Sequence, residues 1–370
     1  MIPIAVTVTV KESRDESYDV VVGRGALAGL PRLLGERCPA SRYAIIADRK
    51  VAELHGARLM TVLADAGLQA HLLTFPAGEW NKSREEWARL TDLMLSAHIG
   101  RDGAVLAFGG GVAGDLGGFV AATYQRGVPY VQLPTSLLAM IDSSVGGKTG
   151  VDVPAGKNLV GAFHQPRVVV ADIDLLTSLP RVQMCSGMAE AIKHGIIRDA
   201  AYYVTLEDEK PTVARDLDQL GEIVRRSIEI KAAVVSADER EAGLRQILNF
   251  GHTVGHAVES LSGFELLHGE AVAIGMVAEL AIADAAGIAP RALRNRVSDL
   301  LERYALPTQI PASLTTDALM NAMRADKKVR AGRIRLALPR ELGAMTQSDD
   351  GAWTVDVEER LMRQVLDSRC

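Results

Sequence analysis

Two histidines lie four residues apart in the segment Leu248–Glu259, which we predict to be helical. His252 and His256 would then point to the same side of the helix, about one turn apart. A third histidine, His268, precedes the next apolar helical segment, and a carboxylate, Glu190, stands upstream. Histidine and carboxylate ligands together favour zinc with an open coordination position, as in catalytic sites. Spacing alone leaves open which three of these four groups would bind a metal, and a pair of packed histidines is the structural alternative.

A glycine-rich segment, Phe108–Asp115, follows an apolar stretch that we predict to be a strand, and it opens a predicted helix. Glycines let the backbone approach a phosphate closely, and a helix N-terminus supplies N–H groups and a positive dipole end. The segment differs from the usual G-x-G-x-x-G pattern, so tight packing is the alternative, but its place after a strand favours nucleotide binding. Asp48 ends an earlier predicted strand, where it could accept a hydrogen bond from a ribose hydroxyl or form a plain turn.

A second glycine-rich segment, Asp142–Gly150, contains the tetrad Gly-Gly-Lys-Thr. Asp142 stands where the phosphate loop of ATPases requires its first glycine, so we reject an ATPase. We predict a glycine-rich loop here, in which Lys148 and Lys157 beside an acid still indicate an anion site, with a merely solvated loop as the alternative. Further polar residues accompany the candidate metal ligands: Lys193, Lys231, Arg245, Asn249, Lys327 and Lys328. Singly each cation is typical of a surface, but jointly they predict a cationic pocket for a small substrate with more than one negative group, such as a phosphate and a carboxylate.

The elements that must position these residues change in type along the chain. Before residue 180, predicted strands alternate with helices, which indicates a parallel sheet covered on both faces. The strands are expected over 4–10, 18–22, 43–48, 70–75, 103–108, 130–133 and 168–171, with helices over 51–66 and 83–97. From 184 to about 323 the pattern is nearly all helical, followed by short strands over 333–338 and 353–355 and a helix over 357–366. We therefore predict two domains, 1–180 and 181–370.

Composition excludes several classes of protein. The 370 residues are 48% hydrophobic and 24% charged, an ordinary globular composition, and the net charge of −5 argues against nonspecific nucleic-acid binding. Three widely spaced cysteines, Cys38, Cys185 and Cys370, form no metal or redox motif and fit a reducing compartment. The N-terminal residues lack the pattern of a signal peptide, and no apolar run reaches the length of a membrane span. We expect a soluble, cytoplasmic protein that acts without nucleic acid or membrane.

Taken in order from Tyr43 to Pro339, these motifs resemble those of the 3-dehydroquinate synthase family, the shikimate-pathway members of the sugar phosphate cyclases. The resemblance implies a Rossmann-like α/β domain that holds NAD+, followed by a mainly α-helical domain that holds Zn2+, with Co2+ as an alternative. It also implies Glu190, His252 and His268 as the metal ligands, which leaves His256 as a catalytic or substrate-binding group.

The resemblance carries over further site residues. The implied cofactor contacts are Asp48, Glu79, Lys82, Gly110, Gly111, Asp115, Thr135, Ser136, Leu175 and Ser178, to which the loop lysines Lys148 and Lys157 are added. Serine stands at 136 and 178 where the family often has threonine, so the hydroxyl is kept. The implied substrate contacts are Asp142, Lys148, Asn158, Lys193, Lys231, Arg245, Asn249, His256 and one of Lys327 or Lys328. Arg126 resembles an arginine that reaches into the neighbouring subunit's site, which implies a homodimer.

The implied reaction converts 3-deoxy-D-arabino-heptulosonate 7-phosphate into 3-dehydroquinate and phosphate. It proceeds by transient oxidation of an alcohol by NAD+, phosphate elimination, return of the hydride, and ring opening with an intramolecular aldol closure. The alternatives within the superfamily are amino-dehydroquinate, 2-epi-5-epi-valiolone and 2-deoxy-scyllo-inosose synthases; the substrates of the last two lack the carboxylate that the cations would bind. A metal-dependent NAD alcohol dehydrogenase and a noncatalytic relative are the remaining alternatives.

Overall fold

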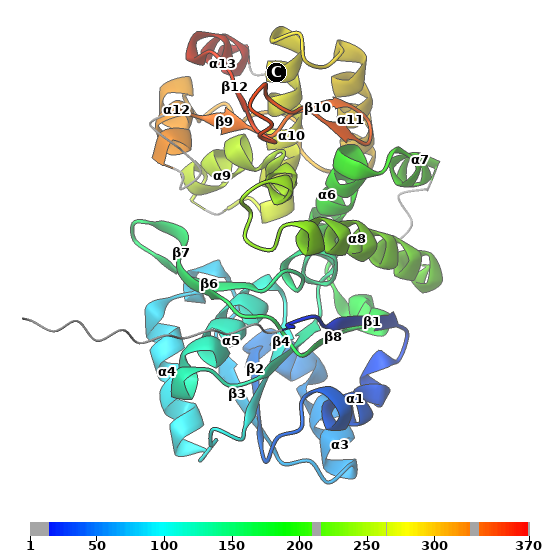
Figure 1. Ribbon diagram of the computed structural model, residues 1–370, viewed down its shortest axis with the longest axis vertical. Helices are drawn as coiled ribbons and strands as arrows, with labels where there is room; N and C mark the ends of the chain where they lie inside the picture. The colour runs from blue at the N-terminus through cyan, green and yellow to red at the C-terminus, as the bar shows by residue number, and fades with distance from the viewer. Residues whose placement is uncertain (1–14, 209–215, 264, 326–332, 369–370) are drawn as a thin grey trace, which may run out of the picture.

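The computed structural model describes residues 15–208, 216–263, 265–325 and 333–368. The strand predicted over 4–10 and the two lysines Lys327 and Lys328 lie outside these residues. The chain forms a parallel sheet in its first half and a group of helices in its second half, and Figure 1 shows the two halves one above the other. No helix in these described ranges is both long and apolar enough to cross a membrane.

Six parallel strands form the sheet in the order β1-β8-β5-β4-β2-β3. Their bounds are β1 Asp19–Gly23, β2 Tyr43–Asp48, β3 Ala70–Phe75, β4 Ala104–Gly109, β5 Tyr130–Pro134 and β8 Val168–Asp172. The strands predicted before residue 180, apart from 4–10, all form this sheet. Because parallel strands end at the same edge, Asp48 at the end of β2 and Gly109 at the end of β4 meet where ligands bind in open α/β folds.

Helices cover both faces of the sheet, because successive side chains of a strand point to opposite faces. Ile45 and Leu106 belong to the core under α1 and α3, whereas Ile46 and Ala107 belong to the core under α4 and α5. These helices are α1 Leu30–Arg37, α3 Ala57–Asp65, α4 Arg84–Ser96 and α5 Gly111–Thr123. The single helix predicted over 51–66 is interrupted: α2 Arg49–Val51 and a π-helical turn, Ala52–Gly56, precede α3.

An antiparallel hairpin replaces the loop that the sequence predicts after residue 142. It consists of β6 Lys148–Val153 and β7 Gly156–Phe163, and Gly150 pairs with Gly161. A Cβ atom on Gly161 would lie 2.2 Å from the carbonyl oxygen of Thr149, so the two strands approach too closely for a side chain there. The small residues that suggested a loop thus serve the close approach of two strands.

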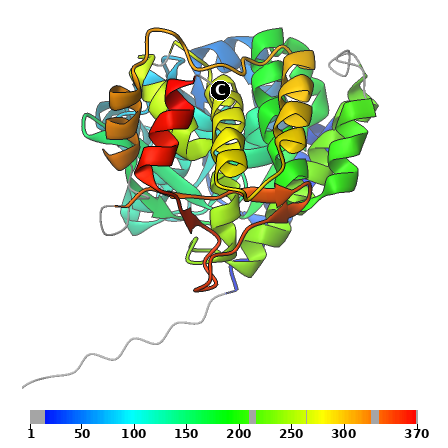
Figure 2. The same ribbon diagram turned by 90° about the horizontal axis from the view of Figure 1, so that it is seen from above.

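The second half packs helices around α10, which is buried along almost its whole length. The helices are α6 Arg181–Arg198, α7 Ala200–Asp208, α8 Leu217–Ala237, α9 His252–Leu261, α10 His268–Ala285, α11 Arg291–Arg303, α12 Thr316–Ala325 and α13 Glu359–Asp367. In Figure 2, α10 lies between α11 and α13. A Cβ atom on Gly275 would lie 1.9 Å from the Gly251 carbonyl oxygen, so α10 and the start of α9 are in close contact.

Short strands complete the C-terminal part. They are β9 Arg335–Leu336, β10 Pro339–Glu341, β11 Ala344–Met345 and β12 Val355–Asp356. The strand expected over 333–338 is thus confined to two residues, which pair with β12, and the hairpin of β10 and β11 was not predicted. The largest hydrophobic core continues from the sheet into these elements, because Val131 and Leu133 of β5 belong to the same cluster as Met188 and Leu336.

Candidate active site

A cavity of about 1430 Å³ lies between the carboxyl edge of the sheet and the helices of the second half. Most of the residues singled out from the sequence line it: Asp48, Glu79, Lys82, Gly110, Gly111, Asp115, Thr135, Ser136, Asp142, Lys148, Lys157, Asn158, Ser178, Lys193, Lys231, Arg245, Asn249, His252, His256 and His268. Glu190 is fully buried just behind its wall. Leu175 is buried behind Ser178, and Arg126 belongs to a separate turn after α5, so neither lines the cavity.

The candidate metal ligands converge from three helices. Glu190 comes from α6, His252 is the first residue of α9, and His268 is the first residue of α10. The Oε1 atom of Glu190 lies 3.4 Å from His252 Nε2 and 3.5 Å from His268 Nε2. The Nδ1–H group of His252 donates to the carbonyl oxygen of Phe250 at 3.1 Å, which leaves Nε2 facing the carboxylate. These three residues form a cluster whose ligand atoms all lie within 4.8 Å of one another.

The donor set of this cluster fits a divalent metal ion. Both carboxylate oxygens of Glu190 are buried: the Lys193 ammonium forms an ion pair with Oε2, whereas Oε1 faces the two histidine rings. Burial opposes the ionisation of Glu190, but Lys193 and the facing histidine rings outweigh it and hold its pKa well below the usual range. An ionised, buried carboxylate beside two imidazole nitrogens is the ligand set of an open zinc site. His256 with Glu259 and His268, and Asp142 with Glu190 and His194, form two overlapping groups.

Cations surround this cluster on the side of the cavity. Lys231, on α8, is buried and donates to the carboxylate Oδ1 and to the carbonyl oxygen of Asp142, both at 2.5 Å. Burial raises the pKa of Asp142, but Lys231 and Lys193 lower it more, so the net shift is downward. Arg245 is almost fully buried and donates to the Gly146 carbonyl at 3.1 Å. The predicted cationic pocket therefore exists, and it carries buried charges held by backbone carbonyls and one carboxylate.

Glu241 is a site residue that the sequence did not reveal. It forms an ion pair with Lys148 and accepts a hydrogen bond from Asn249 Nδ2 at 2.6 Å. Its φ of 60° lies in the left-handed region, which is strained for a residue with a side chain and often marks a functional position. The sequence around 238–243 does not predict a left-handed backbone at Glu241, because a glutamate in a polar loop is common.

A second group of polar residues lies on the sheet side of the cavity. Lys82 is buried and donates to Asp115 Oδ2 at 2.5 Å and to Asn158 Oδ1 at 2.6 Å. Lys157 lies 3.3 Å from Glu79, whose carboxylate also lies 3.9 Å from Lys82. Ion pairs and hydrogen bonds among these five side chains thus join the loop after β3, the helix α5 and the β6–β7 hairpin. This network fixes the hairpin against the edge of the sheet.

The N-terminus of α5 offers an anion site. Gly110 caps this helix without a side-chain hydrogen bond, and a Cβ atom on Gly111 would lie 3.2 Å from Ser143 Oγ. Residues 110–113 line the cavity, and the N-cap supplies no side chain to the N–H groups of this first turn, which suits a phosphate group. Asp48 Oδ1 accepts from the Val51 N–H at 3.0 Å, while Oδ2 points towards Gly109. These residues fit a dinucleotide lying across the edge of the sheet.

Ser178 and Leu175 lie at the far end of this edge. The hydroxyl of Ser178 donates to the Leu175 carbonyl at 3.0 Å, and the ring of His55 contacts the same hydroxyl at 2.7 Å. His55 lines the cavity and was not singled out from the sequence. Thr135 and Ser136 follow β5 at the same edge, so the whole cofactor set implied by the resemblance, Leu175 aside, surrounds one surface.

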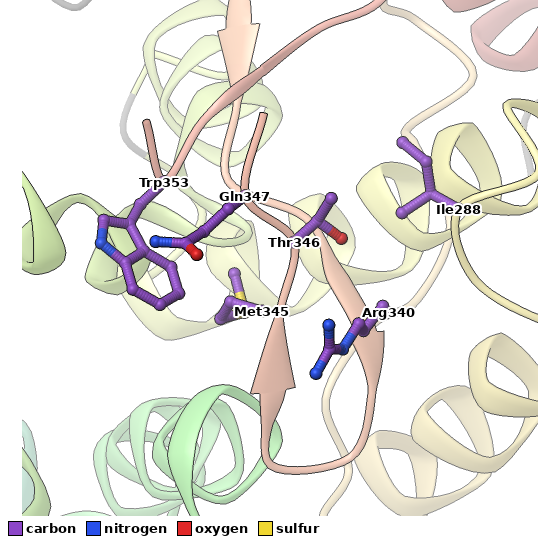
Figure 3. Close-up of a pocket in the computed structure, with 6 residues that line it drawn as sticks. All are labelled: Ile288, Arg340, Met345, Thr346, Gln347 and Trp353. Atoms are coloured by element: carbon purple, nitrogen blue, oxygen red, sulfur yellow. The ribbon is translucent and has the colours of Figure 1, made fainter. Parts of the chain in front are cut away.

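A second cavity, of about 370 Å³, lies in the C-terminal half, and Figure 3 shows the residues that line it. They are Ile288, Arg340, Met345, Thr346, Gln347 and Trp353. These residues offer neither a metal ligand set nor a group of acids and bases. The chemistry therefore belongs to the larger cavity.

Solved structures place this fold and site in one class of enzyme. The 2-epi-5-epi-valiolone synthase of Streptomyces hygroscopicus subsp. jinggangensis, solved with NAD+ and Zn2+, matches with a TM-score of 0.88 and 31% identity, covering 98% of this chain and 99% of that chain. A 2-deoxy-scyllo-inosose synthase, solved with carbaglucose-6-phosphate, NAD+ and Co2+, matches with a TM-score of 0.86 and 26% identity, covering 95% and 96%. The fold and site define a sugar phosphate cyclase.

Sequence comparison gives the family within this class. A model described as 3-dehydroquinate synthase N-terminal matches residues 72–186, and one described as 3-dehydroquinate synthase C-terminal matches residues 187–329. The 3-dehydroquinate synthase of Symbiobacterium thermophilum is 48% identical over 342 residues, which is 92% of this chain and 96% of that protein. The chain belongs to the 3-dehydroquinate synthase family.

Proposed function

We propose that this protein is a 3-dehydroquinate synthase that converts 3-deoxy-D-arabino-heptulosonate 7-phosphate into 3-dehydroquinate and phosphate. The observation that supports this most directly is the cavity itself, which holds a carboxylate–histidine cluster within a group of buried cations. A substrate with both a carboxylate and a phosphate needs several cations, and Lys193, Lys231 and Arg245 all line the cavity. The membership of the chain in the family supports the same substrate.

The proposed cofactors are NAD+ and a divalent metal, Zn2+ or Co2+. When bound, NAD+ accepts and returns a hydride while the metal ion acts as a Lewis acid. Glu190, His252 and His268 are the proposed metal ligands, because their ligand atoms cluster and Oε1 of the buried carboxylate faces both imidazole rings. The proposed cofactor surface runs from Asp48 past the N-terminus of α5 and includes Glu79, Lys82, Gly110, Gly111, Asp115, Thr135, Ser136, Lys148, Lys157, Leu175 and Ser178.

The residues of the cavity would orient the substrate and handle its protons. Lys231 is held by Asp142, so its ammonium points in a fixed direction without freedom to follow the ligand. Asn249 and Lys148 are held together through Glu241, which places an amide and a cation on one wall. His256 lies one turn after His252 and is only partly buried, so its ring can exchange a proton with a substrate hydroxyl. Lys193 and Asn158 complete the proposed substrate set.

Further parts of the proposal concern organisation. We propose that residues 1–180 form the cofactor domain and residues 181–370 the metal and substrate domain. We also propose a homodimer in the cytoplasm, in which Arg126 approaches the neighbouring subunit's site. Arg126 supports this because it lies outside the cavity of its own chain, in a turn whose φ angles at Gln125 and Arg126 are both positive. Lys327 or Lys328 would supply another cation to the substrate.

The substrate can be tested by comparing phosphate release from several sugar phosphates. We expect rapid release from 3-deoxy-D-arabino-heptulosonate 7-phosphate and little from sedoheptulose 7-phosphate or glucose 6-phosphate, because the latter two lack a carboxylate for the cations. Arg245→Met should reduce kcat/KM for the natural substrate by at least tenfold, since a buried cation contributes more than about 1.4 kcal/mol. Preference for either of the other two sugar phosphates would assign the chain to another cyclase activity.

A further inference from the structure

Glu259 is a buried carboxylate that the proposed reaction does not use. It lies on α9, seven residues after His252, and its side chain is 5% exposed. Residues seven apart on a helix lie two turns apart on the same side, so Glu259 faces the cavity like His252. Isolated carboxylates are rarely buried, because their desolvation costs several kcal/mol unless partners compensate. The partners of Glu259 therefore indicate its role.

Each carboxylate oxygen of Glu259 has a different partner. Oε1 accepts a hydrogen bond from the ammonium of Lys157 at 3.0 Å, and Oε2 lies 3.6 Å from Nδ1 of His268. The opposite nitrogen of the same ring, Nε2, lies 3.5 Å from Glu190 Oε1. The imidazole of His268 thus stands between two carboxylates, one on the side of the proposed metal and one on the far side.

This arrangement has a chemical consequence for the tautomer of His268. An ionised carboxylate can only accept hydrogen bonds, so Glu259 favours the tautomer that carries its proton on Nδ1. The lone pair of the neutral ring is then on Nε2, where a metal ion would bind. Histidine ligands in metalloproteins commonly donate their other ring N–H to a carboxylate, which fixes the ring orientation and raises its basicity.

Lys157 connects the same carboxylate to the other half of the molecule. It lies on β7, in the hairpin that Figure 1 shows below α9, and it also contacts Glu79 at 3.3 Å. Glu79 and Lys157 are both proposed cofactor residues. A single carboxylate is therefore in contact with the proposed metal site through His268 and with the proposed cofactor site through Lys157.

From this geometry we propose that Glu259 is a positioning residue that orients His268 for metal binding and ties it to Lys157 across the cavity. The inference rests on the proposed metal and cofactor sites and assigns no new ligand. Glu259 acts through His268, and metal affinity depends on it even without substrate. Because Glu259 contacts residues of both sites, we expect NAD+ and the metal ion to strengthen each other's binding, and linkage requires the two effects to be equal.

The test is an equilibrium titration of the metal-free protein with Zn2+ against a competing chelator, for wild type, Glu259→Gln and Glu259→Asp. A glutamine cannot satisfy both partners: if its oxygen faces Lys157, its NH2 group faces Nδ1 and favours the wrong tautomer. We expect Glu259→Gln to lower Zn2+ affinity 10- to 100-fold. Glu259→Asp keeps the charge but has a shorter side chain, so its Zn2+ affinity should lie between those of Glu259→Gln and wild type. It serves as the second variant if Glu259→Gln does not fold.

Two comparisons separate positioning from other roles. Glu36→Gln, at an exposed glutamate on α1, is the matched control and should bind Zn2+ like wild type. Glu190→Gln removes a proposed ligand and should abolish measurable Zn2+ binding. Glu259→Gln keeps all three proposed ligands, so its Co2+ absorption spectrum should have the same intensity as that of wild type. Lys157→Met should weaken the mutual effect of NAD+ and Zn2+ more than it weakens Zn2+ binding alone.

The outcomes are distinct. Zn2+ affinity of Glu259→Gln within threefold of wild type would overturn the positioning role. Complete loss of Zn2+ binding and of the Co2+ absorption, as expected for Glu190→Gln, would show that Glu259 is itself a ligand and would also overturn it. If wild type bound no divalent ion, the proposed metal site would fail and this inference with it. A lack of activity on the proposed substrate leaves the titration unaffected.

Discussion

Replacing Glu279 should weaken the helix that presents the first proposed metal ligand. Glu279, on α10, is fully buried and accepts hydrogen bonds from three backbone N–H groups: Gly251 at 2.7 Å, Thr253 at 3.0 Å and Val254 at 3.1 Å. These amides surround the start of α9, where N–H groups have no partner within the helix. Their acceptor is a negative charge at the positive end of the helix dipole. Glu279 therefore fixes the position from which His252 enters the site.

The loss of stability expected for Glu279→Gln can be worked out from these three hydrogen bonds. In Glu279→Gln the remaining oxygen can serve Thr253 and Val254, but the new NH2 group faces the N–H of Gly251. The Gly251 amide then loses its acceptor at a cost of about 1–3 kcal/mol, and the two other bonds change from charge-assisted to neutral at about 0.5–1 kcal/mol each. Relief of the buried charge offsets part of this. We expect the free energy of unfolding to fall by about 2–3 kcal/mol.

Urea unfolding of the metal-free protein, followed by far-ultraviolet circular dichroism, measures this loss. Glu36→Gln is the control, because its carboxylate pairs with Arg32 on the surface of α1 and should contribute less than about 0.5 kcal/mol. Zn2+ affinity should fall in Glu279→Gln as well, since the first turn of α9 carries His252. A stability loss below 1 kcal/mol with unchanged Zn2+ affinity would refute the argument.

Three further outcomes are expected. Lys82→Met should lower the free energy of unfolding by about 3 kcal/mol in urea titrations, because the partly buried Asp115 and the amide of Asn158 lose the buried cation that they share; a loss below 1 kcal/mol would contradict this. Burial, aided by a neighbouring lysine, lowers the pKa of His194 to about 3, so below the ordinary pKa near 6.5 the unfolded chain binds a proton that the folded chain does not. The free energy of unfolding should therefore fall as pH drops from about 6.5 towards 4, by up to about 1.4 kcal/mol per pH unit from this group. In unfolding curves recorded at several pH values, His194→Gln should show a smaller dependence of stability on pH. An equal dependence in both proteins would count against this prediction. Burial also raises the pKa of the Cys38 thiol to about 11, so iodoacetamide at pH 8 should leave Cys38 unmodified in the native protein and modify it after unfolding, as mass spectrometry of peptides would show; rapid native labelling would contradict its burial.

The sheet was predictable because its strands are short apolar runs that end at polar or glycine residues. The predicted bounds of 43–48 and 70–75 agree with β2 and β3. The strands predicted over 103–108, 130–133 and 168–171 agree with β4, β5 and β8 to within one residue. The β6–β7 hairpin was wrongly predicted as a loop, because its glycines serve the approach of one strand to another rather than a turn. The interrupted helix over 49–65 shows no breaking residue before its π-helical turn, so periodicity alone favoured one helix.

The candidate site was predictable where residue type carries chemistry and less so where the environment does. Histidines at helical spacing and glycines after a strand point to ligands by themselves, and the structure brings both around one cavity. Glu241, Glu259 and Glu279 gave no such signal, because a glutamate in a helix or polar loop is usually a solvated surface charge. Only the packed structure shows that Glu259 and Glu279 are buried against a histidine, a lysine and a helix start. The division of roles among the site residues stays a proposal.

The central claim is that the bound cofactor is used and regenerated within one turnover that ends in phosphate release. It is tested most directly by mixing the protein with 3-deoxy-D-arabino-heptulosonate 7-phosphate, NAD+ and Zn2+, and by following phosphate and the absorbance of NADH in one cuvette. We predict many equivalents of phosphate per enzyme, no net accumulation of NADH, and loss of both the activity and its metal after treatment with a chelator. Steady NADH formation from simple alcohols, without phosphate release, would contradict the account and identify a dehydrogenase.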